Sequence, residues 1–324
     1  MRHENIINYA MKSLFWCLLL FDVVIPTKNE ASNIIDCLDS IYLASKRLKD
    51  EDVNIIIVDG GSDDGTPEIV KDWGNKFSMP LKVISAPNTK MAHSRIIGAK
   101  NGKEEIIVFL DADDKVSPSF FVNLLSPFQD PNIGAAHIKV KHIQSDSYIG
   151  KAMIAWEKRC PGDRWPYITV FRRSLLPALE CVKDMNLGED YDRHVRLKKF
   201  CEKHKLKIIQ SNAYVYRRPK ESWRSIFKLG ERSGRSIGAY VTCYPSAFKF
   251  ILWAILNASL PLALLLIMTP LNYLSTAFFA VYFAVWIFFL LKGRRDRWIL
   301  LSPLTQLIVG LGFVWGMAKA LIRR

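Results

Sequence analysis

Three carboxylates directly follow an apolar run in this sequence. The run from Ile106 to Leu110 ends at Asp111, and Asp113 and Asp114 come next. Carboxylates two positions apart can bind one hard divalent cation, because Mg²⁺ and Mn²⁺ prefer oxygen ligands. We therefore predict a cation at Asp111 and Asp113 that binds a diphosphate and stabilises the negative charge of a departing nucleoside diphosphate. The alternative is an Asp-rich turn without a ligand.

A further carboxylate, Asp59, also ends an apolar run. Gly60, Gly61 and Ser62 follow it, and glycine permits the tight backbone turns that this segment needs. The Asp59 carboxylate could accept a hydrogen bond from N3 of a uracil ring or from ribose hydroxyls. A capped turn is the alternative for this segment too.

Apolar runs alternate with helical patterns around these carboxylates. We predict strands at 22–26, 54–59, 81–85 and 105–110, with helices between successive strands. Such alternation is typical of a parallel sheet that is covered by helices on both faces and binds ligands at the carboxyl ends of its strands. The first strand-to-helix turn, "PTKNEAS", contains no glycine, and this disfavours a dinucleotide site.

Five segments resemble, in order and spacing, the motifs of family 2 inverting glycosyltransferases with the GT-A fold. The segments are "VVIPTKNE", "IIIVDGGSDDGT", "MAHSRIIGAKNG", "IIVFLDADD" and "LGEDYDRHVRLKK". The resemblance covers roughly residues 22–240. It implies a GT-A-like, Rossmann-type α/β domain with a mostly parallel sheet that binds a nucleotide sugar. Its nucleotide-binding half would be 22–120 and its acceptor half 121–240.

The resemblance also implies roles for particular residues. The first two motifs hold the nucleotide in that family, and the aspartates after the fourth strand hold the metal and the diphosphate. The third motif usually reads A-R-N-x-G; here Ile96 replaces the asparagine, so any contact made by that amide is missing. Arg95 would reach a phosphate, and the alternative is a helix arginine lying in solvent. The residues predicted to bind the donor are Pro26, Thr27, Asn29, Glu30, Asp59, Gly61, Ser62, Arg95, Asp111, Asp113 and Arg232.

Glu189 and Asp190 form a second carboxylate pair. Inversion at a sugar carbon needs a base that takes the proton from the acceptor hydroxyl as it attacks. The resemblance implies that Asp190 is this base and that Glu189 orients it. Two acidic residues at the start of a helix are also stabilised by the helix dipole, which is the alternative explanation for the pair.

A basic segment precedes the apolar C-terminal part of the chain. If residues 222–235 are helical, Arg224, Lys228, Arg232 and Arg235 share one face, which suits a helix lying on an anionic bilayer. A second hypothesis, taken from the resemblance, is that Arg232 closes over the donor diphosphate. A solvated charged face is the third.

Three uncharged apolar runs follow, at 250–268, 271–291 and 298–317. Each has about 20 residues, the length that a helix needs to cross a bilayer. We predict a membrane domain over 241–324 with two or three spans. The third run could lie in the membrane interface and not cross the bilayer. The basic loop 292–297 is expected to be cytoplasmic by the positive-inside rule. Buried helices of a soluble core are the alternative.

The composition restricts the other classes of protein. The 324 residues include 45 Lys and Arg against 31 Asp and Glu, a formal net charge of +14. The basic residues crowd next to the apolar runs, so we expect no nucleic-acid binding. The six cysteines include no close pair, which argues against a zinc site and suits a reducing compartment. We predict an N-terminal extension at 1–21, not a signal peptide, because no cleavage site follows.

Together these patterns predict a multi-pass protein of the cell membrane whose catalytic domain is cytoplasmic. It would be an inverting glycosyltransferase that uses a nucleotide-diphosphate sugar with Mg²⁺ or Mn²⁺ and acts on a polyprenyl phosphate or a lipid-linked glycan. One alternative is a polysaccharide synthase, although the Q-x-x-R-W motif usual in such synthases is missing. Another is a catalytically inactive scaffold that binds sugar nucleotides at the membrane. The retention of both carboxylate pairs argues against this scaffold.

Overall fold

The computed structural model divides the chain into two compact units, which are described separately. The described residues are 20–48, 52–157, 168–179, 188–244, 248–260, 263, 272–292 and 302–322. The first unit takes its described residues from 20–141, 168–179 and 189–217, and the second takes the others. Of the predicted N-terminal extension, residues 1–19 lie outside the described residues, and Phe21 already begins the first strand.

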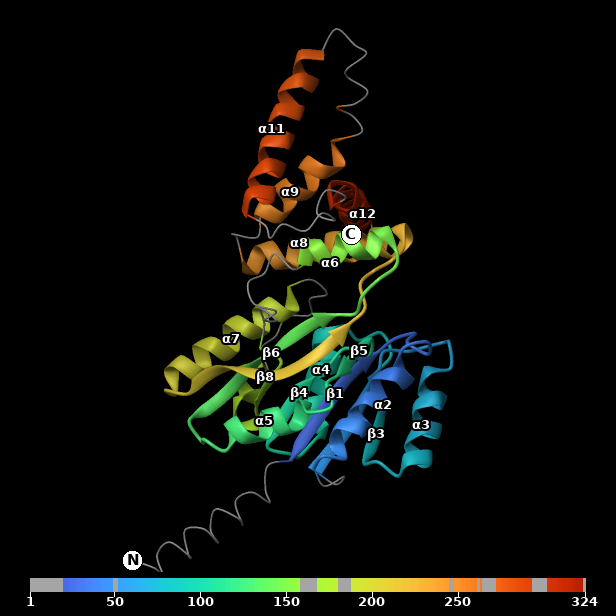
Figure 1. Ribbon diagram of the computed structural model, residues 1–324, viewed down its shortest axis with the longest axis vertical. Helices are drawn as coiled ribbons and strands as arrows, with labels where there is room; N and C mark the ends of the chain where they lie inside the picture. Colours follow the sequence, from blue (N-terminus) through green and yellow to red (C-terminus); the bar gives the residue numbers. More distant parts are fainter. Residues whose placement is uncertain are drawn as a thin grey trace, which may run out of the picture. The chain divides into compact units, whose positions relative to one another are not determined.

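Four parallel strands form one half of the sheet in the first unit (Figure 1). They are β1 (Phe21–Thr27), β2 (Val53–Asp59), β3 (Leu81–Ser85) and β4 (Ile106–Phe109), in the order β3-β2-β1-β4. The residues at the carboxyl ends of β1 and β2 pair directly in the register, Thr27 with Asp59. The four predicted strands are therefore confirmed, and the loops after β1, β2 and β4 leave the sheet at the same edge.

The other half of the sheet is antiparallel. It contains β7 (Val170–Arg172), β6 (Ile133–His142), β8 (Lys207–Arg217) and β5 (Asp114–Val116), which continue the order after β4. β7 pairs antiparallel with β4 and β6, and β5 pairs antiparallel with β8. The prediction of a mostly parallel sheet is thus wrong, since the sheet is mixed. Buried and more exposed residues alternate along much of β8, as is typical of antiparallel strands with one open face.

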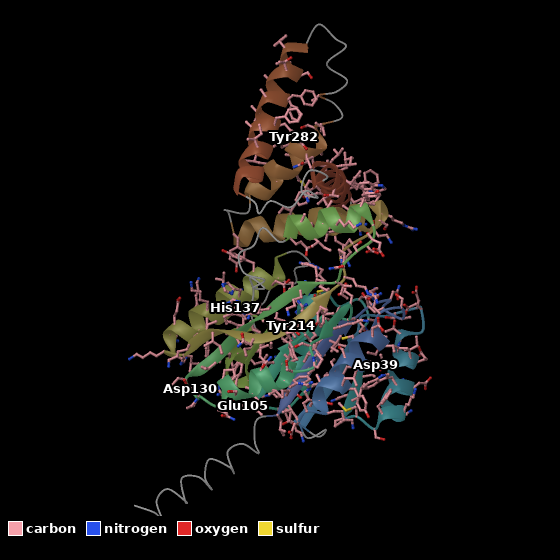
Figure 2. The ribbon with its side chains drawn as sticks, viewed as in Figure 1. Asp39, Glu105, Asp130, His137, Tyr214 and Tyr282 are labelled. Carbon is pink, nitrogen blue, oxygen red and sulfur yellow. The ribbon has the colours of Figure 1, made fainter. Side chains whose placement is uncertain are left out.

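Helices cover both faces of this sheet, as the alternating pattern predicts. Val23 and Ile25 of β1 pack into one apolar core with residues of α2 and α5, whereas Val24 packs into a second core on the opposite face. On the first of these faces Trp73 Nε1 donates to Asp39 Oδ1 at 2.7 Å, which ties α3 to α2. Asp39 is labelled on α2 in Figure 2. The helices of the unit are α2 (Ile34–Ser45), α3 (Thr66–Phe77), α4 (Met91–Asn101), α5 (Phe120–Phe128), η3 (Arg173–Leu179) and α7 (Glu189–Lys203).

Gly98 sets the position of α4 on the sheet. A Cβ atom at this residue would overlap Cγ1 of Val24 and lie 3.1 Å from Cγ2 of Val58. The helix therefore lies directly on β1 and β2, closer than a side chain at this position allows. Arg95 lies about one turn before Gly98 and is 4% exposed. The glycine of the third sequence motif thus positions the helix that carries the arginine of the same motif.

The second unit is helical. Two of its helices, α8 and α12, are in backbone contact, because Cβ atoms on Gly234 or Gly316 would overlap main-chain oxygens of the partner helix. Glu231 of α8 accepts from Lys319 of α12 at 2.7 Å. The helices of the unit are α6 (Tyr148–Glu157), α8 (Trp223–Cys243), α9 (Phe248–Ala258), α11 (Asn272–Lys292) and α12 (Ser302–Ile322).

The predicted membrane spans fall on the last three of these helices. The run 250–268 lies partly on α9 and partly outside the described residues, 271–291 lies largely on α11, and 298–317 lies partly on α12. In the described part of the chain, no helix combines the length and the apolar character that crossing a membrane requires. The structure therefore gives no support to the predicted spans.

The predicted helix in the basic segment is present as α8. Arg224, Lys228, Arg232 and Arg235 are all exposed, whereas Ile226 is fully buried. The helical condition on which the four were expected to share one face is therefore met, and the roles proposed for that face stay predictions.

Candidate functional site

The Asp59 carboxylate orders the turn that follows β2. Its Oδ2 accepts from the backbone N–H groups of Gly61 and Ser62 at 3.0 and 2.9 Å, and its Oδ1 accepts from the hydroxyls of Ser62 and Thr27. A carboxylate has about four lone-pair sites, and these four bonds use them. Gly61 has φ +86°, which favours glycine. The side chain therefore shapes the turn, and its predicted contact with a base or ribose stays a prediction.

The loop after β1 is hydrogen-bonded to this turn. The backbone N–H of Asn29 donates to Ser62 Oγ at 2.9 Å, and the backbone N–H of Asp63 donates back to Asn29 Oδ1 at 3.0 Å. The Glu30 N–H donates to Thr66 Oγ1 at 3.0 Å. The loop residues from the first two motifs are therefore brought together. The remaining predicted residue of this group, Pro26, lies in β1 opposite Val58.

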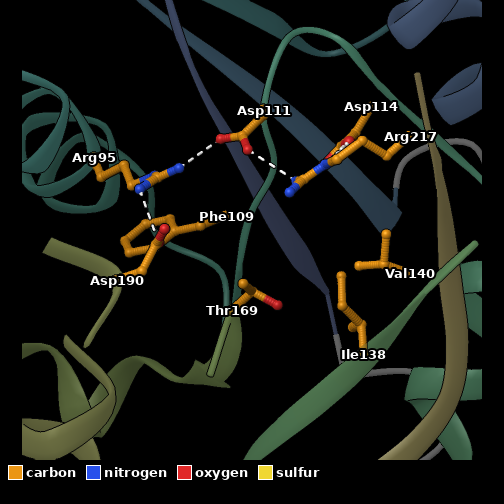
Figure 3. Close-up of a pocket in the computed structure, with 9 residues that line it drawn as sticks. All are labelled: Arg95, Phe109, Asp111, Asp114, Ile138, Val140, Thr169, Asp190 and Arg217. Atoms are coloured by element: carbon orange, nitrogen blue, oxygen red, sulfur yellow. Dashed lines mark hydrogen bonds and ion pairs between the residues drawn. The ribbon is translucent and has the colours of Figure 1, made fainter. Parts of the chain in front are cut away.

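A polar pocket lies among the strand ends of the same unit (Figure 3). Its walls come from α4, β4 and the loop after it, β5, β6, the segment before β7, α7 and β8. The residues that line it are Arg95, Phe109, Asp111, Asp114, Ile138, Val140, Thr169, Asp190 and Arg217. The pocket therefore joins Asp111 from the predicted metal pair with Asp190, the predicted base.

Arg95 links these two carboxylates. Its Nη2 donates to Asp111 Oδ1 at 2.6 Å, and its Nη1 donates to Asp190 Oδ1 at 3.4 Å and to Glu189 Oε1. Burial acts to lower the pKa of the guanidinium, but the carboxylates of Glu189, Asp111 and Asp190 outweigh it and raise the pKa. The alternative that Arg95 lies in solvent is wrong, since the side chain is buried among three acids.

Arg217 is a site residue that the sequence analysis missed. Its Nε and Nη2 donate to the two oxygens of Asp114 at 2.8 and 2.6 Å, and Nη2 also donates to Asp111 Oδ2 at 3.0 Å. Burial raises the pKa of Asp114 to about 6, although the Arg217 charge acts to lower it. Asp114 and Arg217 face each other in the register of β5 and β8. Only that strand pairing identifies the arginine, because no local pattern marks it.

Glu189 and Asp190 have different surroundings although they are neighbours in the chain. The Glu189 side chain is 7% exposed, and burial together with the adjacent Asp190 charge raises its pKa against the effect of Arg95 and Arg193. Asp190 is 32% exposed. Burial acts to raise the pKa of Asp190, but Arg193 and Arg95 outweigh it and hold that pKa well below its usual range. At neutral pH Asp190 is thus an ionised carboxylate at the pocket wall, as a base must be.

The metal site predicted at Asp111 and Asp113 stays a prediction. Among the residues that the structure describes, no three His, Cys, Asp or Glu side chains are grouped so that they could hold a metal ion. Asp111 and Asp113 supply hard carboxylate oxygens, and Mg²⁺ commonly completes its coordination with phosphate and water. Both oxygens of Asp111 accept from arginines, so an ion bound there would have to displace Arg95 or Arg217 from one of them.

Arg232 lies on α8 in the second unit, where its side chain is exposed. The pocket described above belongs entirely to the first unit. The closure of Arg232 over a donor diphosphate therefore stays a prediction.

Comparison with known proteins shows what the first domain is similar to. Residues 22–178 match the sequence model of the family described as "Glycosyl transferase family 2". This match covers slightly less than half of the 324 residues. The predicted resemblance is confirmed over that range.

Two curated relatives match more than half of the chain. EpsJ of Bacillus subtilis, described as an uncharacterized glycosyltransferase, is 24% identical over 61% of this chain and 61% of its own length. The poly(ribitol-phosphate) beta-N-acetylglucosaminyltransferase TarS of Staphylococcus aureus is 21% identical over 63% of this chain and 36% of its own length. The chain thus matches less than two thirds of the length of either relative.

A solved structure extends the comparison to almost the whole chain. The mannosyltransferase PcManGT from Pyrobaculum calidifontis, in complex with GDP-Man and Mn²⁺, covers 95% of this chain and 94% of its own. The TM-score is 0.53 and the sequence identity is 17%. At this identity the likeness shows the fold, which is a GT-A-like α/β fold with a mixed sheet.

Proposed function

We propose that this protein transfers a sugar from a nucleotide-diphosphate sugar to an acceptor with inversion at the sugar carbon. Asp190 is the base that takes the proton of the acceptor hydroxyl, and Asp111 lies on the side of the departing nucleoside diphosphate. The nucleotide is bound by residues of the first two motifs, namely Pro26, Thr27, Asn29, Glu30, Asp59, Gly61 and Ser62. The match to the family 2 model at 22–178 supports this reaction class.

One observation carries the proposal. The guanidinium of Arg95 contacts Asp111 at 2.6 Å and Asp190 at 3.4 Å, so both carboxylates line one pocket. Inversion requires the attacking hydroxyl and the leaving group to lie on opposite sides of the sugar carbon. The two carboxylates meet that requirement, since Asp190 would serve the attacking hydroxyl and Asp111 the leaving group, with the Arg95 guanidinium between them.

The donor is proposed to bind together with Mg²⁺ or Mn²⁺ at Asp111 and Asp113. The mannosyltransferase with a similar fold was solved with GDP-Man and Mn²⁺, which supports a donor and a metal of this kind. When bound, the cation would neutralise charge on the leaving diphosphate. Arg95 and Arg217 each bind one oxygen of Asp111 in the structure, and one of the two would move aside when the ion binds.

A thermal-shift screen of UDP-, GDP- and dTDP-sugars, with and without Mn²⁺, tests the donor proposal. We expect one nucleotide class to raise the melting temperature only when the metal is present. Asp111→Asn should weaken that metal-dependent binding by at least the roughly 10- to 100-fold that loss of an outer partner of a metal site costs. Asp36→Asn is the matched control and should bind normally, since it alters a half-buried aspartate of α2 that pairs with Lys115 of β5. Metal-independent binding of equal strength in both variants would reject the metal site.

The acceptor is proposed to be lipid-linked, either a polyprenyl phosphate or a lipid-linked glycan. On this proposal the protein is a multi-pass protein of the cell membrane with its catalytic domain in the cytoplasm, and residues 241–324 anchor it there. Two features support membrane association. The basic residues Arg224, Lys228, Arg232 and Arg235 are exposed on α8, and large apolar side chains are exposed on α11, among them Phe283.

Flotation with lipid vesicles tests the membrane proposal. We expect the purified protein to float with vesicles that contain anionic phosphatidylglycerol and to float less with neutral vesicles, because each basic residue near an anionic surface contributes roughly 1 kcal/mol. A double variant, Arg224→Gln with Lys228→Gln, should reduce flotation on anionic vesicles. Exchange of two exposed lysines of the first unit, Lys103→Gln with Lys198→Gln, is the control. If the protein stayed in the vesicle-free fraction with both anionic and neutral vesicles, the proposal of membrane association would lose its support.

A further inference from the structure

Four charged side chains close into a ring at the start of α7. Glu189 binds Arg95 through Oε1 and Arg193 through Oε2, the latter at 2.8 Å. Both arginines also bind Oδ1 of Asp190, Arg95 at 3.4 Å and Arg193 through its Nη2. Two negative and two positive groups alternate around the ring. Each buried charge thus has opposite charges beside it, which offsets the cost of removing it from water.

An aromatic ring lies beneath the two arginines. The Cζ atoms of Arg95 and Arg193 are 6.0 and 5.5 Å from the centroid of Phe109, within the range of cation–π attraction. Phe109 is 3% exposed and packs edge-on against Phe171, with 5.2 Å between ring centroids. The end of β4 therefore supports both guanidiniums.

Arg193 has a hydrogen bond on each of its three nitrogens. Nε donates to the backbone oxygen of Ile168 at 2.9 Å, Nη1 donates to Glu189 and Nη2 donates to Asp190. The side chain is 3% exposed and does not line the pocket that holds Asp111 and Asp190. Arg193 lines a neighbouring pocket instead, so it reaches the pocket of Asp111 through its contact with Asp190.

We propose that Arg193, supported by Phe109, is a positioning residue that holds Oδ1 of Asp190 and so directs the Oδ2 atom to the acceptor. The inference rests on the proposed function, in which Asp190 is the base. In the transfer step the acceptor proton moves to Oδ2 while the acceptor oxygen bonds to the sugar carbon. The bond from that carbon to the diphosphate oxygen breaks, and its electron pair leaves with the nucleoside diphosphate.

The pH dependence of kcat distinguishes positioning from a purely structural role. The charged groups around Asp190 are Arg95 on α4 and Glu189 and Arg193 on α7, with Asp111 beyond Arg95. Loss of the Arg193 charge raises the pKa of Asp190. Because the base works when deprotonated, the acid limb of the kcat profile then moves to higher pH. Disruption of the fold alone would lower kcat by the same factor at every pH.

The experiment compares Arg193→Gln, Arg193→Lys and Arg196→Gln in an assay of nucleoside diphosphate release. Arg193→Gln should lower kcat on the order of 100-fold, the effect of a small misplacement of a reacting group, with donor KM unchanged and the acid limb moved to higher pH. Arg193→Lys keeps the charge and should recover part of kcat and return the limb toward its wild-type position. Arg196→Gln breaks a similar pair, Arg196 with Asp192 at 2.8 Å on the same helix, and should leave the profile unchanged.

Phe109→Leu is the second variant, for use if Arg193→Gln does not fold. It removes the ring beneath both guanidiniums and should move the acid limb in the same direction by a smaller amount. The inference alone is overturned if the wild type is active and every folded variant of Arg193 and Phe109 has the acid limb of its kcat profile at the wild-type pH. A wild type that binds the donor but releases no nucleoside diphosphate with any acceptor overturns the proposed function and the inference with it.

Discussion

Replacement of Asp190 by asparagine should lower kcat for sugar transfer by about 10²- to 10⁴-fold, the range contributed by a general base. The amide has the shape of the carboxylate but cannot take the acceptor proton. Donor binding should be nearly unchanged, because the ion pairs of Arg217 with Asp111 and with Asp114 stay intact. The measurement is nucleoside diphosphate release with and without acceptor, alongside donor affinity from thermal shift.

Asp192→Asn is the matched control for this experiment. Asp192 lies two residues further along α7, is 2% exposed and pairs with Arg196, but it does not line the pocket. The control should keep a kcat close to that of the wild type at temperatures where it is folded. If Asp190→Asn retained more than about a tenth of the wild-type kcat, Asp190 would not be the base.

Replacement of Arg173 by methionine should lower the free energy of unfolding by about 3–5 kcal/mol, because it leaves a buried carboxylate without its counter-charge. That carboxylate is Asp22, which is fully buried in β1 and also accepts from Asn54 Nδ2 at 2.7 Å and from the Glu104 N–H at 2.9 Å. The Arg173 guanidinium further donates to the backbone oxygens of Ala99 and Glu104, each at 2.6 Å. The arginine thus joins η3 to β1 and to the loop before β4.

Urea unfolding followed by circular dichroism measures this effect. Lys207→Met is the control, since Lys207 and Asp130 form an exposed pair at 3.6 Å, and such pairs contribute about 0–1 kcal/mol. If Arg173→Met lowered the free energy of unfolding by as little as the control does, the pair with Asp22 would not stabilise the sheet. Asp22 lies at the amino end of β1, opposite the end that carries the site, so folded Arg173→Met should keep its affinity for the donor.

Part of the site follows from local sequence patterns. Apolar runs predict β1 to β4, and the carboxyl ends of parallel strands meet at one edge, so the loops carrying Asp59 and Asp111 are expected to gather there. The motif resemblance added Asp190, which lines the same pocket as Asp111. These predictions succeed because strand periodicity and turn chemistry depend on residues that are close in the chain.

The sequence by itself determined the four parallel strands, the acidic loops at their ends and the helix of α8 with its exposed basic face. Only the tertiary structure decided that Arg217 binds Asp114, that Arg95 and Arg193 bind Asp190, and that Arg173 neutralises Asp22. It also decided that the second half of the sheet is antiparallel. Arg193 and Asp190 are three residues apart on one helix, a spacing at which side chains are neighbours. The other pairings join residues far apart in the chain. The partner of each of those charges therefore depends on strand register and helix packing, which no local pattern in the sequence encodes.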